Sequence, residues 1–298
     1  MDLASQEAQV PIVLAAPEPL SVAYRLALET LGLGKHLTVV AAGGNGVRIR
    51  PRTSHVARPL FRSRRATAAG MITPFSTELF QQLPIVGILR GLATETLEPV
   101  INAARAGGLT NLEITMNTPG AAGQIRAARA LGGRALNVGA GTVTEVGLME
   151  EALAAGASFI VTPALITEVI ERCVQLHVPV FPGALSPAEV RRAGELGATL
   201  VKVFPADLFG PGYLRSLKSS FPTIKLMPTG GVDLLTFAAY AQAGAEAFGI
   251  GSPLFAAQRI AAQDWEWLRT QCRAFAEVYR SLPAGPMNQL GEPVRSTP

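Results

Sequence analysis

The sequence predicts an α/β fold in the form of a (β/α)8 TIM barrel. From Pro84 onward, short runs rich in Val and Ile alternate with stretches rich in Ala, Glu and Arg, at a spacing of roughly two dozen residues. Glycine repeatedly ends a helical stretch just before the next apolar run. Eight such strand–helix repeats favour a closed barrel over an open sheet, because this is the number at which a parallel sheet closes.

The expected strands are short, apolar and enriched in branched side chains. We expect them to be centred on Val86, Glu113, Gly139, Ile160, Val180, Lys202, Leu226 and Phe248. The glycines that separate a helix from the next strand should take a positive φ, as a residue just past a helix end often does. They are Gly107, Gly132, Gly156, Gly197 and Gly244.

Local signals also mark individual helices. Ser186, Pro187 and Glu189 supply an N-cap, a first-turn proline and a capping-box acid, so a helix is expected to begin there. Trp265 to Leu282 is expected to form a terminal helix that completes the outer ring. Residues 71–283 are therefore predicted to form the barrel with its terminal helix, and residues 284–298 a loose tail.

The first 70 residues differ from the rest of the chain. They hold nine Lys and Arg against four Asp and Glu, whereas residues 71–298 hold 17 against 18. A helix over 21–33 and a strand over 37–42 are expected, followed by an Arg-rich stretch without the apolar periodicity of a core. We expect a basic, poorly ordered leader; a basic arm for an acidic partner and a targeting segment are weaker alternatives. Met71 follows directly, which suggests an alternative start and makes the leader a candidate gene-model extension.

Composition excludes several classes of function. The net charge of +4 resides in the leader, so the main domain has no excess of basic residues for binding nucleic acid. The apolar runs are broken by Pro or Gly well before the roughly 20 residues that cross a bilayer, so no membrane span is expected. Two cysteines far apart in the chain indicate reduced thiols and a cytoplasmic protein. Three histidines, only one of them in the patterned region, favour neither a metal site nor histidine-based catalysis.

Lys202 is the candidate nucleophile. It lies in the middle of the apolar strand Leu200-Val201-Lys202-Val203-Phe204, where loss of hydration favours the neutral amine. A neutral amine can attack a ketone and form an imine. The chain has three other lysines: Lys35 lies in the leader, Lys218 is expected on the exposed side of a helix, and Lys225 opens its strand at the far end from the expected site. A lysine that extends along the outer face of its strand is the alternative to a catalytic role.

Glu113 is the second candidate catalytic residue. It lies in the strand Leu112-Glu113-Ile114-Thr115, and a carboxylate that points into a barrel is costly unless it is paired or functional. A carboxyl with a raised pKa in a dry site is suited to moving protons. A purely structural ion pair between Glu113 and Lys202 is the alternative.

Further polar residues and two glycine pairs occupy the carboxyl ends of the expected strands, where barrel enzymes carry their active sites. The glycine pairs, in Thr229-Gly230-Gly231 and Gly249-Ile250-Gly251-Ser252, follow the seventh and eighth strands. Barrel enzymes often bind phosphate at this place through backbone N–H groups, which glycine allows to approach closely. The sequence therefore predicts a phosphate subsite there. The strand ends hold Arg90, Glu113, Thr142, Pro163, Lys202, Thr229 and Ser252.

From Leu83 to Leu254 the chain resembles the class I aldolases of 2-keto-3-deoxy-6-phosphogluconate (KDPG), 2-keto-3-deoxy-6-phosphogalactonate (KDPGal) and 4-hydroxy-2-oxoglutarate (KHG). The resemblance rests on a set of short blocks that occur in the same order. These are Ile88-Leu89-Arg90-Gly91, Leu112-Glu113-Ile114-Thr115, Gly139-Ala140-Gly141-Thr142-Val143, Val161-Thr162-Pro163, Val201-Lys202-Val203-Phe204-Pro205-Ala206 and Pro228-Thr229-Gly230-Gly231-Val232.

The resemblance implies a lyase of carbohydrate metabolism that releases pyruvate and a triose phosphate. Lys202 would form the Schiff base and Glu113 would move protons, with no metal or other cofactor. The resemblance also implies a homotrimer, with a phosphorylated keto acid as substrate. Thr142 and Thr229 would contact substrate oxygens, and Pro163 would pack on the substrate. The phosphate would be held by Gly230, Gly231, Gly251 and Ser252.

Two details of the resemblance disagree about the substrate. The KDPG enzymes commonly place an arginine where this chain has Asn117, whereas the KDPGal type resembles this chain in having Asn there together with Arg90. Arg90 would then bind the substrate carboxylate, as a guanidinium is suited to do. Pro228-Thr229, however, resembles the KDPG type, so the configuration at C4 stays open.

Two other functions remain as alternatives. One is a different phosphate-binding barrel, such as a synthase or isomerase of an amino-acid or thiamine pathway, which would use the glycines without an imine. The other is a non-enzymatic binding protein built on a barrel. Neither requires a lysine in mid-strand, so Lys202 favours the aldolase.

Overall fold

The computed structural model describes residues 13–15, 37–42, 46–51 and 73–282. The chain divides into two compact units, Met1–Arg64 and Arg65–Pro298. In the first unit, β1 (Val13–Ala15), β2 (Leu37–Ala42) and β3 (Gly46–Pro51) form an antiparallel sheet with β3 in the centre. The strand expected over 37–42 is confirmed, whereas the helix expected over 21–33 and the tail over 284–298 lie outside the described residues.

The second unit is built on a curled parallel sheet. All eight expected strand centres fall within its strands. One section has the order β12 (Phe248–Ile250), β4 (Ile85–Leu89), β5 (Asn111–Thr115), β6 (Asn137–Gly141), β7 (Ile160–Val161) and β8 (Val180–Phe181). The other has the order β11 (Leu226–Pro228), β10 (Val201–Val203) and β9 (Gly183–Ala184).

The two sections approach one another at both sides. Pro182 alone separates β8 from β9 along the chain, and its carbonyl accepts a hydrogen bond from the Lys202 N–H at 2.9 Å. At the other side, Thr229 and Gly249 form a parallel bridge just beyond β11 and within β12. The sheet is therefore strongly curled, and its strands are parallel as the sequence predicted.

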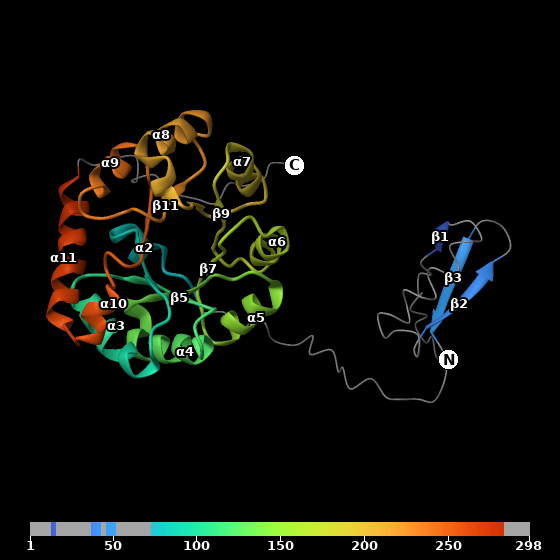
Figure 1. Ribbon diagram of the computed structural model, residues 1–298, viewed down its shortest axis with the longest axis horizontal. Coiled ribbons are helices and arrows are strands. Elements are labelled where there is room, and N and C mark those ends of the chain that lie inside the picture. Colours follow the sequence, from blue (N-terminus) through green and yellow to red (C-terminus); the bar gives the residue numbers. More distant parts are fainter. Residues whose placement is uncertain (1–12, 16–36, 43–45, 52–72, 283–298) are drawn as a thin grey trace, which may run out of the picture. The chain divides into compact units, whose positions relative to one another are not determined.

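Helices surround the curled sheet (Figure 1). They cover its outer face and leave its inner face to side chains, as expected for consecutive βα units. No helix in the described part of the chain has the length and apolar character needed to cross a membrane. The helices are α3 (Leu97–Ala106), α4 (Ala121–Gly132), α5 (Val146–Ala154), α6 (Thr167–Gln175), α7 (Pro187–Glu195), α8 (Gly210–Ser220), α9 (Phe237–Gln242), α10 (Ala257–Ala261) and α11 (Trp265–Ser281).

Local signals at the helix ends are confirmed with one correction. The Ser186 hydroxyl accepts a hydrogen bond from the Glu189 N–H and the Glu189 carboxylate accepts one from the Ser186 N–H, so α7 begins with the predicted capping box. Gly156, Gly197 and Gly244 have the expected positive φ. The expectation for Gly107 and Gly132 is wrong, because both remain in the right-handed region and the turn falls on the next glycine in each case. These next glycines are Gly108 and Gly133.

Aromatic side chains and the short helix α2 (Thr77–Gln82) cover the amino ends of the strands. Phe75 contacts the rings of Phe80 and Phe159, with centroid distances of 5.4 and 5.7 Å. The side chain of Asn137 hydrogen-bonds to both the N–H and the carbonyl of Ser76, which ties the start of α2 to β6. Most of the predicted site residues follow the strands at the opposite, carboxyl ends.

Candidate active site

Glu113 is a fully buried acid on β5. Its carboxylate lies against Gly141 of β6, where a Cβ atom would overlap it. Neither carboxylate oxygen accepts a hydrogen bond from any residue that the structure describes. Burial raises the pKa of Glu113, while the positive charges of Lys202 and then Arg90 lower it in part. The carboxyl thus holds its proton to a higher pH than an ordinary glutamic acid, which suits a proton carrier.

Lys202 lies in the centre of β10, in register with Gly183 of β9 and Met227 of β11. It is 4% exposed, so the side chain does not extend into solvent along the outer face of the sheet. Its Nζ atom lies 5.3 Å from the centroid of the Phe204 ring. Because the Glu113 oxygens have no protein hydrogen-bond partner in the described residues, the purely structural ion pair between Lys202 and Glu113 is not formed. Lys202 nevertheless contributes the largest favourable charge interaction at Glu113.

Arg90 joins two other predicted site residues. It follows β4, and its guanidinium donates to Asn117 Oδ1 at 3.4 Å and to Thr142 Oγ1 at 3.3 Å. Thr142 has a φ of 55°, an uncommon left-handed conformation for a non-glycine residue that often marks a functional site. Arg90, Asn117 and Thr142 therefore form a polar group at the carboxyl ends of three neighbouring strands, with an exposed guanidinium available to an anion.

The predicted phosphate-binding loops lie beside one another. The bridge between Thr229 and Gly249 brings the end of β11 to β12. Gly230 and Gly231 have φ values of 87° and 69°, and a Cβ at Gly231 would overlap Asp207, so this turn requires glycine. The Thr229 hydroxyl is buried and has no partner among the described residues.

A cleft of about 340 Å³ opens beside these loops. Arg90 and Ser252 contribute polar groups to its lining, while Ile88, Leu92 and Phe255 contribute apolar side chains. Gly251 also lines it, so three of the predicted substrate-binding residues face one space. Gly230 and Gly231 lie on the adjacent strand end, outside the lining of this cleft.

Pro163 follows β7 and is half-buried. A Cβ at Gly183 would overlap the Pro163 backbone, and Gly183 is also in register with Lys202. Pro163 therefore packs directly against β9, the strand that pairs with β10 and Lys202.

Several residues that shape the candidate active site were not predicted from the sequence. Phe204 lies inside a block on which the resemblance rests, but its position beneath the Lys202 amine requires the three-dimensional turn after β10. Gly141 and Gly249 are required because Glu113 and Thr229 lie against them, and the pattern of the sequence gives no sign of these contacts. The expectation that Lys218 is exposed is wrong: its side chain is 16% exposed and forms an ion pair with Glu246.

No group of three or more His, Cys, Asp or Glu side chains among the described residues is arranged to hold a metal ion. The candidate site combines a buried amine, a buried acid without a hydrogen-bond partner among the described residues, an exposed guanidinium and a glycine-rich pair of strand ends.

Comparison with known proteins shows the family of the chain. The family described as "KDPG and KHG aldolase" matches residues 77–271. The chain belongs to this aldolase family. The KDPG and KHG aldolase family thus covers the described part of the second unit almost completely, from α2 to within α11.

Individual members of the aldolase family are similar over most of their length. The 2-dehydro-3-deoxy-6-phosphogalactonate aldolase of Escherichia coli is 35% identical over 201 residues, which cover 67% of this chain and 96% of that protein. The 2-dehydro-3-deoxy-phosphogluconate aldolase of Treponema pallidum is 37% identical over 192 residues, covering 63% and 90%. A crystal structure of the KDPG aldolase from Legionella pneumophila, with pyruvate captured as a covalent carbinolamine, has a TM-score of 0.60 and 27% identity. It covers 66% of this chain and 96% of that protein.

Proposed function

We propose that the protein is a class I aldolase that cleaves KDPG or KDPGal to pyruvate and glyceraldehyde 3-phosphate. The observation that carries this proposal is the buried Lys202 amine, whose charge acts on Glu113, a buried acid without a hydrogen-bond partner among the described residues. Membership of the aldolase family and the captured pyruvate of the Legionella relative support it. The same residues would also serve KHG, which is the alternative substrate.

In the proposed reaction, the Lys202 Nζ lone pair attacks the C2 carbonyl carbon of the substrate. The resulting carbinolamine loses water and forms a protonated imine. A base removes the proton of the C4 hydroxyl, the C3–C4 bond breaks, and its electron pair moves into the imine to give an enamine. The aldehyde leaves, the enamine takes a proton at C3, and water releases pyruvate and restores the amine.

Glu113 is suited to the proton transfers of this sequence. Burial raises the pKa of Glu113, so its carboxyl keeps a proton to a higher pH than an ordinary glutamic acid and can give it up in one step and take it back in another. Because its oxygens are not engaged by protein groups in the described structure, they are available to substrate or to a bridging water. We infer that Glu113 acts as general acid and base, while Lys202 acts as nucleophile.

The remaining predicted residues would hold the two charged ends of the substrate. Arg90, steadied by Asn117 and Thr142, would bind the carboxylate as a planar hydrogen-bond donor. Thr142 and Thr229 would contact hydroxyl or carbonyl oxygens, and Pro163 would pack on the apolar side of the substrate. The backbone N–H groups at Gly230, Gly231, Gly251 and Ser252 would receive the phosphate.

We further propose that the strands close into a complete (β/α)8 barrel. The Thr229–Gly249 bridge and the hydrogen bond from the Glu246 N–H to the Leu226 carbonyl at 3.0 Å support closure between β11 and β12. We also propose a homotrimer, which exposed apolar side chains on the β10 and β11 loops would help to form; these are Phe204, Leu208, Phe209 and Leu235. The two free, buried cysteines agree with the proposed cytoplasmic location.

A comparison of substrates tests the proposed function. Pyruvate release from KDPG, KDPGal and KHG should be followed with a coupled lactate dehydrogenase assay at matched concentrations. We expect one phosphorylated sugar acid to have a kcat/KM well above that of KHG, since only the phosphorylated substrates use the loops after β11 and β12. Absence of pyruvate release from all three substrates would refute the aldolase.

A further inference from the structure

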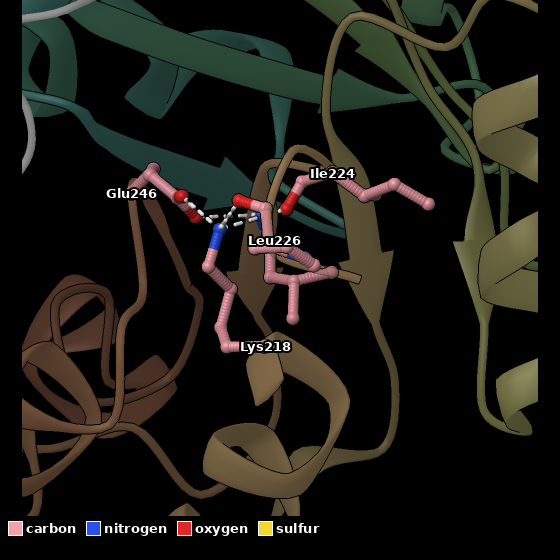
Figure 2. A network of polar contacts seen from close by, with 5 residues as sticks. Lys218, Ile224, Leu226 and Glu246 are labelled. Atoms are coloured by element: carbon pink, nitrogen blue, oxygen red, sulfur yellow. Dashed lines mark hydrogen bonds and ion pairs between the residues drawn. The ribbon is translucent and has the colours of Figure 1, made fainter. Parts of the chain in front are cut away.

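An ion pair near the amino ends of β11 and β12 joins three segments around the curled sheet. Glu246 lies two residues before β12, and its Oε1 atom pairs with Lys218 Nζ of α8 (Figure 2). Its Oε2 atom accepts a hydrogen bond from the N–H of Leu226, the first residue of β11, at 2.8 Å. A single carboxylate therefore connects α8, β11 and the approach to β12.

Lys218 completes this network with its remaining donors. Its Nζ atom donates to the carbonyl of Ile224 at 2.9 Å and to that of Pro222 at 3.1 Å, in the turn that leads into β11 (Figure 2). Its aliphatic stem packs over Gly244, where a Cβ would lie 2.9 Å from Lys218 Cγ. Both side chains are largely buried, with 16% and 11% exposure. Charges buried to this extent are costly unless they are paired and hydrogen-bonded, so the pair is well defined in position.

The Glu246 carboxylate adds a contact to the seam between β11 and β12. Among the described residues, the backbone contacts across it are the Thr229–Gly249 bridge and hydrogen bonds from the Glu246 and Ala247 N–H groups to the Leu226 carbonyl, at 3.0 and 3.4 Å. By contrast, β4 and β5 pair over four successive positions. At this seam the N–H of Leu226 therefore donates to the Glu246 carboxylate, whereas in a regular sheet it would donate to a backbone carbonyl of the neighbouring strand.

The same seam ends at the proposed phosphate subsite. Leu226 and Thr229 are three residues apart, which is about 10 Å along a strand. The loop with Gly230 and Gly231 follows β11, and the loop with Gly251 and Ser252 follows β12. A change in the pairing of such short strands at one end shifts the loops at the other end, because little intervening structure can absorb it.

We propose that the Lys218–Glu246 pair is a positioning device for the phosphate subsite: it holds β11 and β12 in the register at which the loops after both strands can grip one phosphate group. This inference rests on the proposed function. Neither residue touches the substrate, and the pyruvate-forming half of the reaction at Lys202 does not depend on the pair. Loss of the pair therefore weakens binding of the phosphate group more than it affects imine formation.

The experiment uses the full chain with Lys218→Met, which retains the stem over Gly244 but removes the charge, and with the double variant Lys218→Met/Glu246→Gln. The double variant removes both charges of the pair and serves where the single variant, which leaves Glu246 without Lys218, does not fold. For each, KM and kcat with the preferred phosphorylated substrate, inhibition by inorganic phosphate and the rate of borohydride trapping with pyruvate are measured. We expect KM and the phosphate inhibition constant to rise about tenfold, with kcat and trapping within about twofold of the wild type.

Two controls separate positioning from general loss of stability. Lys218→Arg retains the charge and should restore the wild-type KM. Val100→Ala, in the fully buried face of α3, lowers stability at a place remote from this seam and should leave KM unchanged at a temperature where it is folded. An unchanged KM and phosphate inhibition in the Lys218 and double variants would overturn the inference, as would an equal rise in KM for Val100→Ala. Failure of the wild-type protein to trap pyruvate would instead refute the proposed function.

Discussion

Two buried ionisable side chains carry the proposed chemistry, and they have different surroundings. Lys202 lies above an aromatic ring, whereas Glu113 is enclosed by strands without a hydrogen bond from a described residue. A buried carboxyl in this state lowers the stability of the fold, which is a common feature of active sites. The residue types and their positions in apolar strands could be predicted from the sequence. The contacts of Phe204 and Gly141 with them could not, because they depend on how neighbouring strands are aligned.

Replacing Glu113 with Gln should separate the role of the nucleophile, Lys202, from the role of the proton carrier, Glu113. We expect kcat to fall about 10²- to 10⁴-fold, the range for loss of a general acid–base group, while pyruvate trapping at Lys202 is retained at least in part. Steady-state kinetics and borohydride trapping on the same preparation provide the test. Wild-type turnover in Glu113→Gln would show that this acid does not carry protons.

The same variant should change how stability depends on pH. Burial raises the pKa of Glu113 above 4.5, so its contribution to stability is fully present below that value and is lost as pH rises through the raised pKa. Gln stays neutral, so Glu113→Gln should gain in melting temperature relative to the wild type between pH 5 and pH 8. A difference that does not vary over this range would argue against a raised pKa.

Gly141 should be intolerant of a side chain. A Cβ there overlaps the Glu113 carboxylate, so Gly141→Ala should displace the acid, lower kcat by at least about tenfold and destabilise the protein by about 1–3 kcal/mol. Gly123 in α4 is a matched control, since it is exposed and a methyl group added to it would lie 4.0 Å from the nearest atom. Gly123→Ala should leave kcat unchanged and be neutral or stabilising. Equal activity of the two variants would contradict the proposed place of Glu113 in the site.

At the scale of single elements, local signals located even the shortest strands. The apolar runs identified β7 and β8, which have two residues each. Gly156 ends the helix before β7, whereas the non-glycine residue His177, with a φ of 55°, takes the equivalent place before β8. Helix periodicity failed for Lys218, since its partner Glu246 lies 28 residues further along the chain. Contacts between distant segments of this kind leave no local pattern, so the seam between β11 and β12 could not be predicted.

The capping box of α7 gives a prediction at this scale. Hydrogen bonds from the Ser186 backbone and hydroxyl and from the Leu185 backbone lower the pKa of Glu189. Its contribution to stability is therefore present above pH 4.5 and is lost as pH falls through the lowered pKa. Glu189→Gln should lower the free energy of unfolding by about 0.5–1 kcal/mol at pH 7 and by less at pH 3. Urea unfolding at the two pH values would measure this difference. An equal cost at both values would contradict the role of the charge.

At the scale of the whole molecule, the second unit contains its own core and its own closure at the amino ends. Phe75, Ser76 and α2 supply this closure, and all of them lie after residue 70. The parallel order of the strands and the outer position of the helices followed from the sequence. The contacts at the β11–β12 seam join segments that are distant in the sequence, and such contacts leave no local pattern from which they could be predicted.

Removal of residues 1–70 should therefore leave the aldolase intact. We expect the shortened protein, residues 71–298, to have a kcat/KM and a melting temperature close to those of the full chain. Size-exclusion chromatography with light scattering on both forms would also test the proposed trimer. An insoluble or inactive shortened protein would show that the leader contributes to the fold or to the site.

Formation of an imine at Lys202 is the central claim, and trapping with pyruvate tests it most directly. The protein is incubated with pyruvate and sodium borohydride, digested and analysed by mass spectrometry, with Lys202→Ala as the control. We predict one reduced pyruvate adduct, located on Lys202, and loss of both adduct and aldol cleavage in the control. An adduct on Lys218 or Lys225, no adduct at all, or retained cleavage by Lys202→Ala would contradict the account.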